Sequence, residues 1–181
     1  MELKPQDLLV LFKQVTQPAQ VLTYAALGEA VQISASQAHR SVQRCLASGL
    51  AVSRGRGEWQ AMRSALLEFA VHGVRYAFPA TLGPARRGIP TSFGTLPLSR
   101  HINSAAGQAP VWAHPRGTLK GPSVSPICPT APDVALADPA LHQLLALLDA
   151  LRIGRARERE LAKQLLAAAL RADAPEAPLA A

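Results

Sequence analysis

The stretch "SASQAHRSVQRCLASGLAVSRGRGEWQ", Ser34 to Gln60, decides how the N-terminal part of this chain folds. Ser34 is a favourable N-cap, and the residues after it predict a helix that runs to about Ser48. Gly49 follows directly and is expected to cap the C-terminal end of that helix. The rest of the stretch carries arginines between glycines, which favours an exposed turn rather than a buried segment.

A β-hairpin is predicted directly after this helix. Residues 50–52 and 58–60 form its two short strands, and residues 53–57 form the turn between them. Glycine adopts the positive φ that such a turn requires. Arg54 and Arg56 flank Gly55 at the tip, where we expect both side chains to be exposed.

Two further helices are predicted upstream of Ser34. Pro5 and apolar residues at helical spacing predict a helix from about Pro5 to Thr16. Thr23 is a favourable N-cap for a second helix, Tyr24 to about Val31. The expected order is therefore three helices followed by a small hairpin.

This order resembles the winged helix-turn-helix domain of bacterial transcription regulators, broadly of the MarR or IclR type. The resemblance rests on "LTYAALGEAVQISASQAHRSVQRCLASGLAV", residues 22–52, in the N-terminal third of the chain. It implies that the third helix lies in the major groove of DNA and that the hairpin acts as a wing on the backbone. One departure is that Val31 and Gln32 occupy the turn, where glycine or another small residue is common.

The third helix is expected to have a buried side and a DNA-facing side. At about 100° per residue, Ala38, Val42 and Cys45 gather on the side that packs inward. The opposite side carries Arg and Gln, which can pair with the edges of guanine and adenine. The predicted DNA-binding residues of the helix and the hairpin are Ser34, Ser36, Gln37, Arg40, Gln43, Arg44, Arg54 and Arg56.

Composition and charge fit a nucleic-acid partner but do not by themselves establish one. The chain has 181 residues and a formal net charge of +7, which suits a partner that carries phosphates or acidic side chains. No apolar run approaches the roughly 18 residues needed to cross a bilayer, and the start of the chain lacks the features of a secretory signal. Cys45 and Cys128 fit a reduced compartment. A cytoplasmic protein is expected.

The middle of the chain is rich in proline, and 11 of the 15 prolines fall between Pro79 and Pro139. Such a segment is expected to be mostly loop and short strand, held in place by its apolar residues. Residues 111–112 and 118–119 predict a second hairpin. Arg86-Arg87, between glycines and a proline, is expected in an exposed basic loop.

The C-terminal part predicts helices. Asp138 and Pro139 form a cap and a first turn, and leucines from Leu141 to Leu151 form an apolar stripe. Gly154 interrupts the helix, which then resumes. The arginines around this break are expected on a solvated surface with ion pairs to nearby glutamates.

These predictions give a mainly α (α+β) fold. We expect a homodimer, since a single recognition helix contacts few base pairs, and its seams would be the leucine stripe and a fourth helix that starts near Met62. The expected parts are a winged helix-turn-helix with its following helix (1–75), a Pro-rich loop and hairpin region (76–135), C-terminal helices (136–172) and a flexible tail (173–181).

Motifs for catalysis or cofactor binding are missing from the sequence. The histidines and Cys128 lie far apart without metal-ligand spacing, and there is no phosphate-binding glycine loop or nucleophile elbow. We therefore expect no enzyme activity, no catalytic residues, no metal and no cofactor.

Three classes of function remain open. The first is a transcriptional regulator, most simply a repressor, that binds double-stranded DNA. The second is the antitoxin of a toxin–antitoxin pair, which represses its own operon and binds a partner protein, the toxin, through its C-terminal half. The third is a winged helix that binds proteins and not DNA.

Overall fold

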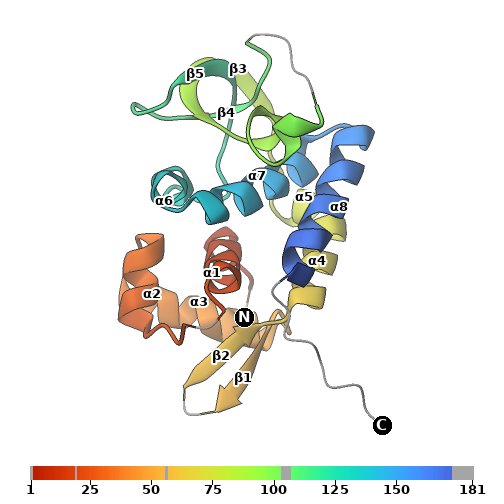
Figure 1. Cartoon of the computed structure of the whole chain (residues 1–181). Coiled ribbons are helices and arrows are strands. Elements are labelled where there is room, and N and C mark those ends of the chain that lie inside the picture. The colour runs from red at the N-terminus through yellow and green to blue at the C-terminus, as the bar shows by residue number, and fades with distance from the viewer. Residues whose placement is uncertain (1, 19, 56, 103–106, 173–181) are drawn as a thin grey trace.

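The computed structural model describes residues 2–18, 20–55, 57–102 and 107–172, and its fold is α+β (Figure 1). The helices are α1 (Pro5–Thr16), α2 (Tyr24–Val31), α3 (Ala35–Ala47), α4 (Arg63–His72), α5 (Val74–Ala77), α6 (Ala131–Ala137), α7 (Pro139–Ile153) and α8 (Ala156–Ala172), with 3-10 turns η1 (Ser92–Gly94) and η2 (Leu98–Arg100). The strands are β1 (Ala51–Gly55), β2 (Glu58–Ala61), β3 (Leu82–Pro90), β4 (Val111–Ala113) and β5 (Leu119–Val124). The β1–β2 hairpin and the β3–β5 barrel lie at opposite ends, with helices between them.

Helices α2 and α3 have the predicted caps. The Thr23 hydroxyl accepts a hydrogen bond from the amide of Ala26 at the start of α2. At the start of α3, Ser34 Oγ accepts from the Gln37 amide, and Gln37 Oε1 accepts from the Ser34 amide, which completes a capping box. Gly49, with φ of 73°, follows the end of α3 as predicted.

The turn between α2 and α3 depends on a glycine that lies inside α2. Gln32 takes the left-handed conformation there, with φ of 56°, and so occupies a position that glycine usually fills. A Cβ atom on Gly28 would lie 2.6 Å from the carbonyl oxygen of Ile33. Glycine at position 28 therefore lets the turn and the start of α3 pack directly onto α2.

The predicted hairpin after α3 is confirmed. Strands β1 and β2 pair antiparallel from Ala51 opposite Ala61 to Gly55 opposite Glu58, with a bulge at Arg54. Gly55 and Gly57 have φ of 87° and 82°, which is the left-handed region that the turn requires. The predicted fourth helix is also present, as α4.

The Pro-rich region folds differently from the prediction. Strands β4 and β5 exist, but they do not form a hairpin with each other; both pair antiparallel with β3, and the three strands close into a small barrel. Arg86-Arg87 therefore lies in a strand and not in a loop. Pro84 falls where the β3–β5 register shifts, so its missing N–H interrupts no regular pairing. A Cβ on Gly88 would lie 2.0 Å from the Trp112 carbonyl oxygen, so only glycine fits there.

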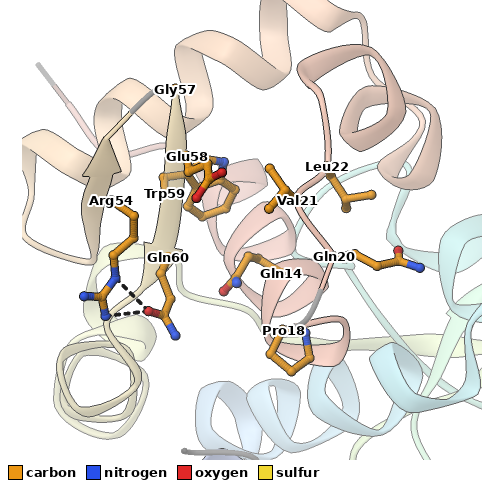
Figure 2. A pocket seen from close by; sticks show the side chains of 10 residues that line it. All are labelled: Gln14, Pro18, Gln20, Val21, Leu22, Arg54, Gly57, Glu58, Trp59 and Gln60. Carbon is orange, nitrogen blue, oxygen red and sulfur yellow. Dashed lines mark hydrogen bonds between the residues drawn. The ribbon is translucent and has the colours of Figure 1, made fainter.

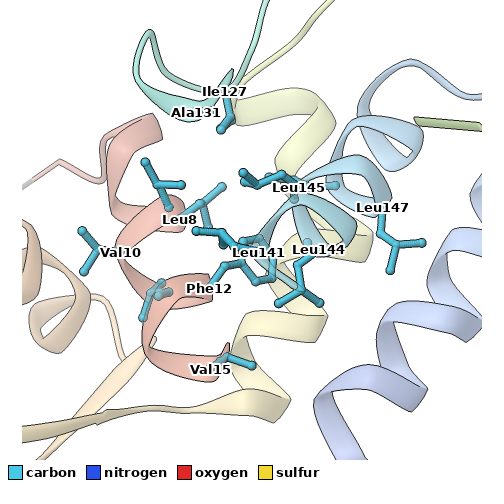
Figure 3. Packing of buried hydrophobic residues seen from close by; sticks show 14 of the residues in the cluster. Leu8, Val10, Phe12, Val15, Ile127, Ala131, Leu141, Leu144, Leu145 and Leu147 are labelled. Carbon is cyan, nitrogen blue, oxygen red and sulfur yellow. The ribbon is translucent and has the colours of Figure 1, made fainter. Parts of the chain in front are cut away.

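The leucine stripe of α7 is buried inside the single chain. Helix α7 begins after the predicted Asp138 cap and ends at Ile153, with Gly154 as its C-cap. Leu141, Leu145 and Leu148 are fully or almost fully buried, and Figure 3 shows part of the stripe facing α1. In α4, Leu66 and Ala70 are likewise fully buried. The prediction that the leucine stripe of α7 is a dimer seam is wrong, because the chain covers this stripe with its own helices. In α4, Ala65 and Phe69 are only half-buried.

Helix α1 is buried on almost every side. Every residue from Leu8 to Val15 is buried, including Lys13 and Gln14. One side of α1 packs on α3 and β2, and the other side packs on α7 (Figures 1 and 3). The N-terminal and C-terminal parts of the chain therefore share one hydrophobic core.

A buried polar network attaches the barrel to α7. Asp149 is 1% exposed and accepts hydrogen bonds from Thr91 Oγ1 (2.9 Å), Trp112 Nε1 (2.6 Å) and Arg152 Nη1 (2.6 Å). Arg152 also donates to the carbonyl oxygens of Phe78 and Ser125. The prediction of a solvated surface is wrong for Arg152, since a carboxylate one turn earlier binds it inside the core.

The ion pair between α1 and the N-cap of α7 can be tested by pH. Lys13 Nζ donates to Asp138 Oδ2 at 2.7 Å, while Asp138 Oδ1 caps α7. Burial alone would raise the pKa of Asp138, but the hydrogen bond and charge of Lys13 and the Leu141 amide together lower this pKa. A lowered carboxyl pKa stabilises the fold above the unfolded-state pKa of about 4, and this stabilisation is lost as the pH falls through the folded-state pKa.

We expect Asp138→Asn to lower the free energy of unfolding by about 1–3 kcal/mol at neutral pH. Asparagine caps helices as well as aspartate does, so the loss isolates the ion pair. In urea unfolding at a series of pH values, the difference from the parent chain should shrink below about pH 4. Glu68→Gln, on the exposed side of α4, is the control. A difference that is constant with pH would show that the ion pair does not stabilise the fold.

Candidate nucleic-acid interface

Helix α3 is held in place by one buried carboxylate of α1. Asp7 Oδ2 accepts from the Nε of Arg44 at 2.7 Å, and Asp7 Oδ1 accepts from the Nη2 of Arg44 at 2.6 Å and from Ser41 Oγ. Asp7 Oδ2 also accepts from the Lys4 amide at 2.7 Å, so the same carboxylate completes the N-terminal turn of α1. Asp7 and Ser41 are fully buried.

The prediction that Arg44 faces outward with the DNA-binding residues is therefore wrong. Its side chain is 9% exposed and makes a two-point ion pair with Asp7. The hydrogen bond from Arg44 to Asp7 raises the pKa of Arg44. A helical projection places Arg44 at the edge of the buried side, and its position was decided by a carboxylate 37 residues earlier in the chain.

The outward face of α3 carries four of the predicted residues in exposed positions, and a fifth is half-buried. The exposed residues are Ser34, Ser36, Gln37 and Arg40, and the half-buried residue is Gln43. Arg40 Nε donates to the carbonyl oxygen of Ser36 at 3.3 Å, and its terminal guanidinium nitrogens have no partner among the described residues. Among the described residues, no carboxylate lies within ion-pair distance of Arg40.

The polar groups at the start of α3 are partly occupied by one another. Ser34 Oγ lies 3.1 Å from Ser36 Oγ, and the oxygen of the Gln37 amide is used in the capping box. The side-chain nitrogen of Gln37, Nε2, has no partner among the described residues and is free to donate. The first turn of α3 therefore offers donors, which suit phosphate or base acceptors.

Sequence reasoning missed a contact beside this face. His39 is exposed, and its ring packs edge-on against Tyr24, with 4.8 Å between the ring centroids. Tyr24 is the first residue of α2, so this pair joins the starts of the two helices. The signal in the sequence was an aromatic residue directly after the Thr23 cap.

The hairpin presents Arg54 in a fixed orientation. Arg54 is exposed, and its Nε and Nη2 both donate to Gln60 Oε1, at 2.9 and 2.6 Å, as Figure 2 shows. A small hollow of about 160 Å³ lies between β2 and the α1–α2 connection. The other predicted arginine of the turn, Arg56, lies outside the described residues.

The two cysteines show no sign of reactivity. Cys45 is fully buried on the inward side of α3, as predicted, and Cys128 is also buried. Burial raises the pKa of both thiols. Within residues 2–18, 20–55, 57–102 and 107–172, no group of three or more His, Cys, Asp or Glu residues is placed to hold a metal ion. No helix in these ranges is long and apolar enough to cross a membrane.

Comparison of the chain with family models, with curated proteins and with solved structures finds no match.

Arg44→Met is expected to act on stability and not selectively on ligand binding. It removes the charge partner of Asp7 and leaves a buried carboxylate unpaired, which should cost about 3–5 kcal/mol of unfolding free energy. The exposed Arg40→Met should change stability by less than about 0.5 kcal/mol. Chemical unfolding of both variants makes the comparison.

A second variant keeps this test meaningful if Arg44→Met fails to fold. The double substitution Asp7→Leu with Arg44→Met removes both charges and should recover much of the lost stability, because the buried carboxylate is gone. If Arg44→Met is as stable as the parent chain, the ion pair does not hold α3 in place.

Proposed function

We propose that this chain is a sequence-specific DNA-binding transcriptional regulator, most simply a repressor. The observation that carries the proposal is the outward face of α3, where Arg40, Gln37 and Ser36 are exposed together while the opposite face is fixed on α1. A helix presented in this way fits the major groove, and Arg and Gln are the side chains best suited to guanine and adenine edges.

The hairpin supports the same function. It follows α3 directly and lies at the same end of the molecule (Figure 1). Arg54 is held by Gln60, so little side-chain entropy is lost when it meets a phosphate. In this arrangement α3 provides sequence preference and the hairpin provides affinity for the backbone.

The test of base contact is Arg40→Ala. On the DNA upstream of its own gene, this change should weaken binding by about 1–3 kcal/mol if Arg40 makes a bidentate base contact. Arg157→Ala, an exposed arginine on α8, removes the same charge away from α3 and should have a smaller effect. Fluorescence anisotropy measures the affinity of each variant for that DNA and for a scrambled duplex. Unchanged binding by a folded Arg40→Ala variant would contradict the docking of α3.

The contribution of the hairpin is tested separately by salt. Phosphate contacts act through released counterions, so Arg54→Ala should weaken binding to the upstream and scrambled duplexes by similar factors. The slope of log affinity against log salt should become shallower by roughly one unit. An unchanged slope would show that Arg54 does not contact the backbone, and a selective loss on the upstream DNA would show that it contacts bases.

A further inference from the structure

The barrel region has a charge distribution that the proposed function does not use. Residues 69–132 contain no aspartate or glutamate, and the nearest acids on either side are Glu68 and Asp133. The same stretch contains six cationic side chains: Arg75, Arg86, Arg87, Arg100, Arg116 and Lys120. Half of them lie on the paired strands β3 and β5, at the end of the molecule away from α3 (Figure 1).

On these strands, cations face each other directly. Arg87 pairs with Lys120 across the antiparallel β3–β5 ladder, and the adjacent Arg86 pairs with Gly121. All three cationic residues are exposed. Like charges directly opposite each other destabilise a sheet, so the folding of the chain alone does not favour this arrangement. We call Arg86, Arg87 and Lys120 the basic strand pair.

No acid of the described residues neutralises the basic strand pair. Asp133, in the first turn of α6, is already bound by Arg116 and His114. Arg87 Nε donates to the carbonyl oxygen of Gly117 at 2.6 Å, which fixes its orientation. Within the part of the chain that the structure describes, Arg86 and Lys120 make no side-chain hydrogen bond or ion pair, so their charges remain available to a ligand.

We propose that the basic strand pair is a second nucleic-acid contact, which binds the phosphate backbone of a duplex without sequence preference. Successive residues of a strand point to opposite faces, so Arg86 lies on one face and Arg87 and Lys120 lie on the other. Cations therefore lie on both faces of this part of the ladder. Strand β4 pairs with β3 only from Gly88 to Pro90, so the ladder at Arg86 and Arg87 is two-stranded. A DNA major groove is wide enough for a two-stranded ribbon, and phosphates line both of its sides.

The neighbouring residues favour a nucleic acid over an acidic protein. Most residues beside the cations have small side chains: Gly83, Pro84, Ala85, Gly121 and Pro122. Of the large apolar residues on these strands, Leu119 is half-buried, and the exposed Leu82 lies at the far end of β3. Protein–protein interfaces are centred on buried aromatic or large apolar anchors, whereas phosphate contacts need only accessible cations and close backbone approach. The choice of partner rests on the proposed DNA-binding function. Because the basic strand pair lies at the end of the molecule away from α3, it would contact a second DNA segment or DNA that bends back along the molecule.

The experiment compares two double variants in the full chain. Arg86→Gln with Lys120→Gln removes two charges of the basic strand pair and leaves the structural Arg87 in place. Arg155→Gln with Arg157→Gln is the matched control, because it removes two exposed charges from the start of α8. Each is made in the parent chain and in an Arg40→Ala, Arg54→Ala background, and circular dichroism confirms that each variant is folded. Anisotropy with a random-sequence duplex is measured over a series of salt concentrations.

In the Arg40→Ala, Arg54→Ala background, the strand-pair variant should have a slope of log affinity against log salt that is shallower by about two units, and the control should not. An unchanged slope, or an equal change in the control, overturns the second contact. A second result would also overturn the second contact. Labelled poly-glutamate would bind the parent chain more tightly than the duplex does and would lose this binding in the strand-pair variant. The partner would then be an acidic protein.

Titration of the parent chain with its upstream DNA and with the scrambled duplex, beside these salt series, separates this inference from the proposed function. If the parent chain does not prefer its own upstream DNA but the strand-pair slope changes, the proposed regulator function fails and the second contact stands. If the preference is present and the slope is unchanged, the second contact fails and the regulator function stands.

Discussion

The buried carboxylate of Asp7 is the constraint on which the arrangement of the N-terminal helices depends. It accepts hydrogen bonds from the Lys4 amide, the Ser41 hydroxyl and the Arg44 guanidinium, so it closes the first turn of α1 and fixes α3 with one group. A carboxylate without water is tolerated because these donors replace its hydration. The contact of Arg44 with Asp7 therefore sets the rotation of α3 about its own axis. This rotation leaves Arg40 exposed.

Helix α1 connects the N-terminal helices to the C-terminal half of the molecule. Its other side packs on the leucines of α7, and Lys13 binds the carboxylate that caps α7. Helix α7 in turn holds the barrel through Asp149 and Arg152. The N-terminal helices consequently depend on the C-terminal half for burial of α1, and the leucines of α7 are unavailable to a second subunit without rearrangement.

Local signals predicted the elements of the N-terminal part and the start and end of α7, because caps, glycines and helical spacing act within a few residues. Long-range pairing was not predictable in the same way. Strand β3 contains prolines and glycines that normally break strands, and it forms because two distant strands pair with it. Arg44 and Arg152 resemble surface residues in the sequence, and distant or buried carboxylates place them inside. Of the candidate site, the exposed serines, Gln37 and Arg40 follow from helical spacing alone.

The most direct test of the central claim is hydrogen exchange of the intact chain with and without the DNA upstream of its own gene, measured by mass spectrometry. If α3 docks in the groove with the hairpin on the backbone, amide exchange should slow in peptides that cover α3 and β1–β2 on that DNA, and less on a scrambled duplex. Binding that leaves exchange in both segments unchanged would contradict the claim that these elements form the DNA-binding face.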